Sequence, residues 1–322
     1  RWYCGLKEAH GPYAKGNPRP RARIIRSADG VHWESVKLLE RRACGVADPK
    51  FSITDEGALM VATNIAFPPG GINQPDPLNP QYGPARRWSV TWLTQDGVDW
   101  GAMYACPSGV NVLRYEVTWH NGMGYSLTYP NSGSIGTLYR TADGRSWQPI
   151  ASNVFAQWFA TKPDWLGRTD AEVDPHDMHQ TGKEPSRLPS ESALAFDPDD
   201  GTAWAITRVH PVFAILGSAK QPRYDEWTWR PLYVDFDGDG NCVPAYEKLG
   251  VQMGGPTMQF LTNGVLLAAG RADASTPEEQ LGRLTLFRVD RENAVLKRWG
   301  DFDGYSHYPG LVEHDGKLWI SC

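Results

Sequence analysis

The 322-residue sequence lacks several features that would assign it quickly to a class. It contains no run of about 18 apolar residues, so it shows no candidate membrane-spanning helix. Positive charge is not in excess, because 32 Lys and Arg stand against 37 Asp and Glu, and a net charge of −5 argues against nucleic acid as a general partner. Helical periodicity is nearly absent. Cysteine is scarce and never spaced C-x-x-C, which indicates neither a zinc site nor a dense disulfide framework; the five residues are Cys4, Cys44, Cys106, Cys242 and Cys322.

Turn-forming and aromatic residues are abundant instead. The chain has 33 Gly, 25 Pro and 14 Trp, and it is long enough for one large β domain or two ordinary ones. Short alternating apolar runs are punctuated by Asp-Gly or Asn-Gly, which are strong hairpin signals because a tight turn needs positive φ. The chain begins with "RWYCGL" and ends with "LWISC", both typical of strand interiors, so we expect trimmed ends.

Five segments share one design, a β run, a glycine-containing turn and a second β run. Their turn glycines recur at intervals of 52 to 79 residues, which suits four-stranded propeller blades that carry insertions. "RWYCGL" is then expected to be the return strand of a sixth, earlier hairpin. The five segments are "KFSITDEGALMVATN", "YEVTWHNGMGYSLTY", "SALAFDPDDGTAWAITR", "TMQFLTNGVLLAAGR" and "PGLVEHDGKLWISC", with turn residues Gly57, Gly122, Gly201, Gly264 and Gly316.

A heptad follows a third β run in three of the repeats: "SADGVHW" (27–33), "TQDGVDW" (94–100) and "TADGRSW" (141–147). Its hydroxyl and Asp side chains can accept hydrogen bonds from amides of their own turn, and its Gly can take positive φ. The Trp is expected to cover apolar space between sheets. One copy would be an ordinary hairpin, but three copies after matching strands predict a repeat architecture.

The pattern [ST]-x-D-G-x-x-W resembles the Asp box (BNR repeat) of the sialidase, or neuraminidase, superfamily. The resemblance covers nearly the whole chain. It implies an all-β fold, a six-bladed β-propeller with four-stranded antiparallel blades, as a single domain over residues 1–322. A long insertion at about 152–190 would emerge on the top face, where it could form a lid. The boxes also occur in non-enzymatic propellers, so the fold does not give the function.

In such a blade the heptad turn lies at the bottom, and the residues that enter the first strand, leave the second or enter the third meet at the top. A charged residue near a loop end is usually solvated, so only their joint placement on one face indicates a site. These upper positions hold arginines, acids, histidines and one tyrosine: Glu8, His10, Asp48, Arg86, Arg87, Arg114, Glu116, Glu191, Arg208, Arg271, Arg283, His307 and Tyr308.

Three stretches resemble family segments with known roles. "SESALAFDPDDGTAWAITR" resembles the segment that a Glu opens and an Arg closes, which implies Glu191 and Arg208. "GRLTLFRVD" resembles the segment of the last substrate-binding arginine, which implies Arg283 with Arg271 as its rival. "HYPGLVEHDGKLWIS" resembles the segment of the nucleophilic tyrosine, Tyr308. The substrate-binding set expected on this basis is Arg208, Arg271, Arg283, Arg87, His10, Glu8 and His307.

The chemistry explains why these residue types belong together. A phenol with a pKa of about 10 is a poor nucleophile at neutral pH, but a neighbouring carboxylate, Glu191, can take the proton of Tyr308 as it attacks. A neutral phenol avoids repulsion by an acidic sugar, and arginines can bind the sugar carboxylate. The alternatives stay open: Tyr308 as a buried core residue with Tyr305 as a rival, and Glu191 as an ordinary loop carboxylate.

The sequence departs from the family where the acid/base aspartate is expected. "KEAHGPYAKGNPRPRARI" contains no Asp, so Glu8, His10 or Asp48 would have to serve, and we favour Asp48 as the proton donor. The alternative is that Asp48 only caps the strand entry in "GVADPKFSIT". The family's first arginine would fall before residue 1. A different proton donor leaves open an acidic sugar other than sialic acid.

The sequence therefore predicts an exo-acting retaining glycosidase that releases a terminal acidic sugar from a glycan or glycoconjugate. The alternatives are a non-catalytic propeller that binds glycan or protein, and a polysaccharide lyase using Tyr, His10 and His307 on a uronate. The resemblance favours a secreted or periplasmic location, and we expect no required cofactor; the net charge argues against a nucleic-acid partner.

Three further groups of residues are weaker candidates. One is a structural calcium loop of Asp235, Asp237, Asp239 and Asn241, although Tyr246 replaces the expected Glu. Another is a metal site of His176, His179, Asp174 and Asp177, for which a solvated loop is the alternative. The third is a ring-closing disulfide between Cys4 and Cys322, for which separate thiols are the alternative.

Overall fold

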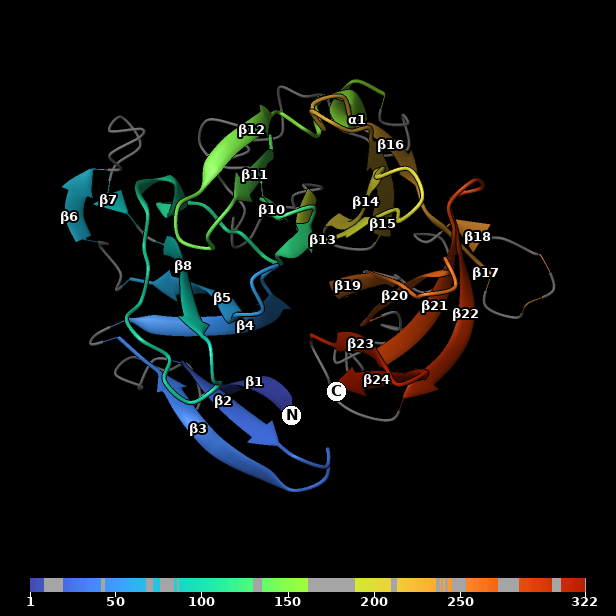
Figure 1. Ribbon diagram of the computed structural model, residues 1–322. Helices are drawn as coiled ribbons and strands as arrows, with labels where there is room; N and C mark the ends of the chain where they lie inside the picture. Colours follow the sequence, from blue (N-terminus) through green and yellow to red (C-terminus); the bar gives the residue numbers. More distant parts are fainter. Residues whose placement is uncertain are drawn as a thin grey trace, which may run out of the picture. The chain divides into compact units, whose positions relative to one another are not determined.

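The structure is a computed structural model in which nearly all the regular elements of the described residues are β-strands (Figure 1). It forms two compact units: residues 1–126 with 139–149, and residues 127–138 with 150–322. The described residues are 1–8, 20–41, 44–67, 72–75, 84–85, 87–129, 135–161, 189–209, 213–235, 238, 240, 243–244, 253–271, 284–302 and 308–321.

The first unit contains two three-stranded antiparallel sheets and most of a four-stranded one. In each, strands that follow one another along the chain lie side by side, as in a propeller blade. The first sheet is β1 (Trp2–Glu8), β2 (Arg21–Ser27) and β3 (Trp33–Leu39); the second is β4 (Gly45–Ile53), β5 (Leu59–Ala66) and β8 (Arg87–Thr94). A small hairpin, β6 (Ile72–Pro75) and β7 (Pro84–Ala85), lies between β5 and β8 along the chain, and a 3-10 turn, η2, spans Pro107–Gly109. The four-stranded sheet, whose residues belong to both units, is β9 (Thr118–His120), β10 (Met123–Leu127), β11 (Thr137–Thr141) and β12 (Gln148–Ser152).

The second unit continues with the same meander. Its first sheet is β13 (Pro189–Phe196), β14 (Ala203–Val209), β15 (Phe213–Ala219) and β16 (Thr228–Pro231). The next is β19 (Gly254–Phe260), β20 (Leu266–Arg271), β21 (Leu284–Asp290) and β22 (Val295–Phe302), extended beyond β22 by β17 (Tyr233–Asp235) and β18 (Val243–Pro244). A hairpin of β23 (Gly310–His314) and β24 (Lys317–Ser321) follows.

All five predicted hairpins are present, and all five turn glycines have φ between +69° and +81°. The expectation of six four-stranded blades is wrong. The described residues form five blades of three or four strands, and β23 with β24 forms only a hairpin. After β8 the chain returns alongside it and makes only two isolated bridges, Thr91 with Tyr104 and Trp88 with Val110. Gly101 at φ +53° precedes Tyr104, and the 3-10 turn at Pro107–Gly109 separates the two bridges, so no continuous strand forms there.

The three heptads adopt one turn geometry. In each, the hydroxyl of Ser27, Thr94 or Thr141 accepts a hydrogen bond from the heptad's glycine amide at 2.8–2.9 Å. The Asp Oδ1 accepts two more, at 2.8 Å each, from amides two and three residues later. The Trp residues of the second and third heptads are buried as expected. Trp33 is not: it is 42% exposed on the outer strand β3, and its indole N–H donates to the Gly30 carbonyl.

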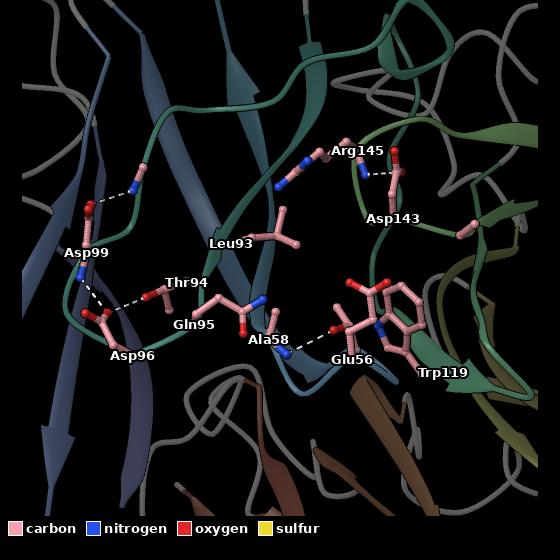
Figure 2. A pocket seen from close by; sticks show the side chains of 13 residues that line it. Glu56, Ala58, Leu93, Thr94, Gln95, Asp96, Asp99, Trp119, Asp143 and Arg145 are labelled. Carbon is pink, nitrogen blue, oxygen red and sulfur yellow. Dashed lines mark hydrogen bonds between the residues drawn. The ribbon is translucent and has the colours of Figure 1, made fainter.

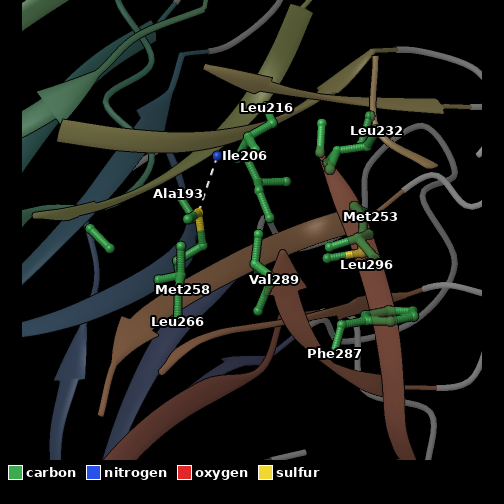
Figure 3. Close-up of a cluster of buried hydrophobic side chains, with 14 of the residues drawn as sticks. Ala193, Ile206, Leu216, Leu232, Met253, Met258, Leu266, Phe287, Val289 and Leu296 are labelled. Atoms are coloured by element: carbon green, nitrogen blue, oxygen red, sulfur yellow. Dashed lines mark hydrogen bonds between the residues drawn. The ribbon is translucent and has the colours of Figure 1, made fainter. Parts of the chain in front are cut away.

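A large hydrophobic cluster in the second unit is built from both of its large sheets (Figure 3). Ile206 and Leu216 come from one sheet, and Phe287 and Leu296 come from the other. All four side chains are completely buried, and each contributes about 1.5–3 kcal/mol of transfer free energy. This packing fixes β13 against β19, the two strands that carry the candidate site.

A β-bulge recurs near the start of the first strand in three hairpins. The register shifts between Ala47 and Lys50 in β4, between Pro189 and Ser192 in β13, and between Gly254 and Thr257 in β19. Two residues then face one on the return strand, and such bulges re-aim side chains next to functional sites. The bulged pairs are Asp48–Pro49 opposite Thr63, Ser190–Glu191 opposite Arg208, and Gly255–Pro256 opposite Gly270.

The predicted insertion at 152–190 begins with a short helix, α1 (Ala156–Thr161). The carbonyl of Val154 accepts a 2.7 Å hydrogen bond from the Trp229 indole, and Gln157 accepts one from the Trp229 amide. The start of the insertion is therefore fixed to β16. Residues 162–188, where a lid was expected, lie outside the described residues. None of the helices in the described part is long and apolar enough to span a bilayer.

Candidate active site

Glu191 is the centre of a buried polar cluster in the second unit. It lies in the β13 bulge and is only 6% exposed. Its Oε1 accepts a 3.0 Å hydrogen bond from the Tyr308 hydroxyl. Its Oε2 accepts one from the Gly255 amide at 2.7 Å and one from Arg208 Nη1 at 3.2 Å. The two carboxylate oxygens therefore have different partners: Oε1 accepts from the Tyr308 phenol, and Oε2 accepts from Gly255 and Arg208.

Hydroxyl groups tie the β13 bulge to strand β14. Ser190 donates to the Arg208 carbonyl at 3.2 Å, and Ser192 donates to the Ser190 carbonyl at 3.2 Å. The Ser192 and Thr207 hydroxyls lie 2.9 Å apart. These hydrogen bonds link residues of the β13 bulge to one another or to strand β14. They therefore fix the position of Glu191 relative to Arg208.

Arg271 and Tyr308 complete the cluster. Arg271 is the last residue of β20, and its guanidinium carbon lies 5.8 Å from the centre of the Tyr308 ring, within cation–π range. Tyr308 and Pro309 directly precede β23. The sequence therefore predicted four residues that the structure brings together: Glu191, Arg208, Arg271 and Tyr308.

Electrostatics keep Glu191 ionised. Burial raises the pKa of its carboxyl, but the charge of Arg208, the hydrogen bonds from Gly255 and Tyr308 and the charge of Arg271 outweigh burial, so the pKa lies below its ordinary value. An ionised carboxylate that already accepts a phenol hydrogen bond can take that proton when the phenol attacks an electrophile. Two guanidinium groups beside this pair can bind an anion.

The predicted upper residues of the first unit make contacts within that unit. Asp48 lies in the β4 bulge at φ +57°, with its Oδ1 3.5 Å from Lys7 Nζ in a partly exposed ion pair. Glu8 accepts two hydrogen bonds from Arg23, a bidentate ion pair between β1 and β2. Arg87 begins β8, and its backbone exchanges hydrogen bonds with Asn111.

Arg114 lies in the interior and not at the surface. Its guanidinium donates to the carbonyls of Ser108 and Ser89, and its carbon lies 4.7 Å from the centre of the Trp147 ring. Burial lowers the pKa of this guanidinium. We therefore assign Arg114 to the support of the third heptad, whereas the sequence placed it among the upper residues. Glu116, half-buried, precedes β9.

Several residues that the sequence pattern singled out lie outside the described residues, and their roles stay predictions. They are His10, Arg86, Arg283, His307, Tyr305, Asp237, Asp239, Asn241, Tyr246, Asp174, Asp177, His176, His179 and Cys322. Of the calcium loop, Asp235 is described, and its Oδ1 accepts a 2.8 Å hydrogen bond from the Gly238 amide. Within the described ranges, no three His, Cys, Asp or Glu side chains gather as a metal site would require.

A separate pocket of about 390 Å³ lies in the first unit at the heptad end of β4 (Figure 2). The turn between β4 and β5 and the second and third heptads form its walls, and Trp119 of β9 lines one side. Asp96 uses its carboxylate within its own turn, where the amides of Val98 and Asp99 lower its pKa. None of the predicted site residues that the structure describes lines this pocket.

Comparisons with solved structures show which known fold this chain resembles. No protein-family model and no curated protein matches the sequence. The NanB sialidase of Streptococcus pneumoniae matches 99% of this chain over 62% of its own, with 10% identity and a TM-score of 0.62. The sialidase of Trypanosoma rangeli matches 99% over 49% of its own, with 14% identity and a TM-score of 0.60, and the Hadza microbial sialidase Hz136 matches 99% over 60%, with 12% identity and a TM-score of 0.61.

The chain thus has an all-β propeller fold similar to that of sialidases, and it spans about half to three fifths of their length. At these identities the likeness shows the fold alone. The assignment of the heptads to the Asp box stays a prediction.

Sequence reasoning missed Gly254 and Gly255. The signal was available in "GGPT", a glycine pair directly before a proline at the start of a strand, which is typical of a bulge or a close backbone approach.

Proposed function

We propose that the protein is an exo-acting, retaining glycoside hydrolase of sialidase type that releases a terminal acidic sugar, sialic acid or a related sugar, from glycans. The observation that supports this best is the 3.0 Å hydrogen bond between Tyr308 and the buried, ionised Glu191, with Arg208 and Arg271 beside it. A non-catalytic propeller has no need of a phenol directed at a buried base. The fold likeness to sialidases is consistent with the proposal.

In the first step, Tyr308 Oη attacks the anomeric carbon while Glu191 takes the phenol proton. The bond to the leaving oxygen breaks, and a general acid donates the proton that this oxygen needs; the sequence predicts Asp48 for this role. Arg208 and Arg271, together with Arg283, bind the sugar carboxylate. In the second step water attacks the same carbon and gives its proton to the conjugate base of that acid, and Tyr308 leaves and recovers its proton from Glu191. Two inversions give net retention.

The test is a panel of aryl glycosides with sialic acid and uronic acid donors, run on the wild type, Tyr308→Phe and the control Tyr233→Phe. Tyr233 is an exposed residue of β17 in the same unit. We expect an acidic donor to be cleaved by the wild type and the control, and Tyr308→Phe to lose nearly all activity. Equal rates for Tyr308→Phe and the wild type would remove Tyr308 from the mechanism.

The same panel separates the alternatives. NMR of the first-formed sugar anomer tests retention directly. Binding of an acidic sugar without cleavage by the wild type would favour the non-catalytic propeller. Ultraviolet-absorbing unsaturated products would instead identify a lyase.

A further inference from the structure

The β19 bulge contacts two of the four clustered side chains through two adjacent glycines. Gly254 pairs in register with Arg271, and Gly255 donates its amide to Glu191 Oε2. Gly255 has φ +63°, a conformation that side chains other than glycine rarely adopt. The bulge is therefore next to both the base and one of the anion-binding groups.

The space above Gly254 is already occupied. A Cβ added there would lie 2.6 Å from Arg271 Nη2, 2.7 Å from its Nε and 2.9 Å from its Cζ. The Arg271 guanidinium thus packs directly on the Gly254 backbone, in the place where any other residue would have its side chain. The atoms that would clash are at the end of a flexible side chain, so a substitution moves Arg271 and leaves the sheet intact.

We propose that Gly254 is a positioning residue that holds the Arg271 guanidinium beside the Tyr308 ring and Glu191, and so sets the affinity of the site for an anionic sugar. This inference rests on the proposed function for its substrate. Its geometric part, the dependence of Arg271 on a glycine at position 254, does not.

The test compares Gly254→Ala, Arg271→Ala and the double variant with the control Gly300→Ala. Gly300 is a strand glycine of the same sheet, and a Cβ there meets nothing within 4 Å. On an aryl sialoside we expect Gly254→Ala to raise KM by about tenfold to a hundredfold, the range for a lost hydrogen bond to a charged group, with a smaller change in kcat. The Kd for N-acetylneuraminic acid, measured by calorimetry, should rise in parallel.

The double variant decides whether the effect acts through Arg271. If it does, Gly254→Ala has little further effect in the Arg271→Ala background, because the displaced group is already gone. A Gly254→Ala variant that binds and turns over substrate like Gly300→Ala would overturn the proposal. So would a loss that persists undiminished without Arg271.

A second measurement separates this inference from the proposed function. If the wild type neither binds nor cleaves any acidic sugar, the proposed function fails, and the free energy of unfolding as a function of pH then decides the positioning role. The charge of Arg271 helps to lower the pKa of Glu191. Moving Arg271 raises that pKa, so Gly254→Ala should lose more stability at neutral pH than in acid. A loss independent of pH, like that expected for Gly300→Ala, would refute the positioning role.

Discussion

Replacing Glu191 with glutamine tests the cluster most directly. The amide has one acceptor oxygen where the carboxylate has two, so it can accept hydrogen bonds from Gly255 and Arg208 or from the Tyr308 hydroxyl, but not from both sets, and its NH2 group is only a donor. Losing a hydrogen bond to a charged group costs about 1.5–3 kcal/mol. Removing one partner of a buried ion pair costs about 3–5 kcal/mol. Because both costs arise from the same carboxylate, we expect Glu191→Gln to lower the free energy of unfolding by about 3 kcal/mol at neutral pH.

The pH dependence of this loss distinguishes a charge effect from a packing effect. The folded-state pKa of Glu191 lies below its ordinary value, so its contribution to stability is present above that ordinary value and disappears as the pH falls through the folded pKa. Urea unfolding should therefore show a large difference between wild type and Glu191→Gln at neutral pH that shrinks in acid. The control is Glu292→Gln, an exposed turn carboxylate of the same unit, which should change stability by less than about 0.5 kcal/mol.

The same variant tests the proposed base. Loss of a general base costs about 100-fold to 10,000-fold in rate, so kcat of Glu191→Gln should fall by that range. The wild type should stay active at pH values below the ordinary pKa of a glutamate.

The stability experiment has a clear contradictory outcome. If the difference in the free energy of unfolding between wild type and Glu191→Gln stayed constant over the whole pH range, the carboxylate would not be held as an ion, and the proposed charge network of the site would be wrong.

Two further predictions concern stability. Thr94→Val removes the acceptor of the buried Gly97 amide and should lower the free energy of unfolding by about 1–3 kcal/mol in urea, whereas Thr94→Ser keeps the hydroxyl and should lose less; equal losses would show that the heptad hydroxyl is unimportant. Arg291→Ala breaks an ion pair with Asp197 and two aromatic contacts, so its melting temperature should fall clearly below that of Arg288→Ala, an exposed neighbour, and identical melting temperatures would contradict this.

Local features of the fold followed directly from the sequence. The hairpins were predictable because a glycine in the turn fixes the backbone there, whatever the rest of the chain does. The heptad hydrogen bonds were predictable for the same reason, since donor and acceptor lie within three residues. The burial of each Trp depends on a neighbouring sheet, and there the prediction failed for Trp33 while it held for Trp100 and Trp147.

The candidate site was predictable in part. Glu191 and Tyr308 came from a family resemblance in separate segments, and their 3.0 Å contact follows from the packing of sheets that no local pattern describes. Arg114 was misplaced because two of its partners, Ser89 and Trp147, are distant in sequence. The "GGPT" stretch indicated a bulge or a close approach, but the contact of Gly254 with Arg271 depends on the register with the partner strand, which no local pattern gives.

The recurrent bulge shows that one type of backbone irregularity can carry residues of different chemistry. Three hairpins have a two-against-one bulge near the start of their first strand, occupied in turn by Asp48 with a proline, by Glu191 with a serine and by Gly255 with a proline. The bulge sets the direction in which its residues leave the sheet. The amino acid at the bulge decides whether a side-chain carboxylate or only a backbone amide is presented there. A different acid or base can therefore be introduced by a single substitution at a bulge residue such as Glu191, which does not have positive φ, whereas Gly255 at φ +63° disfavours any side chain.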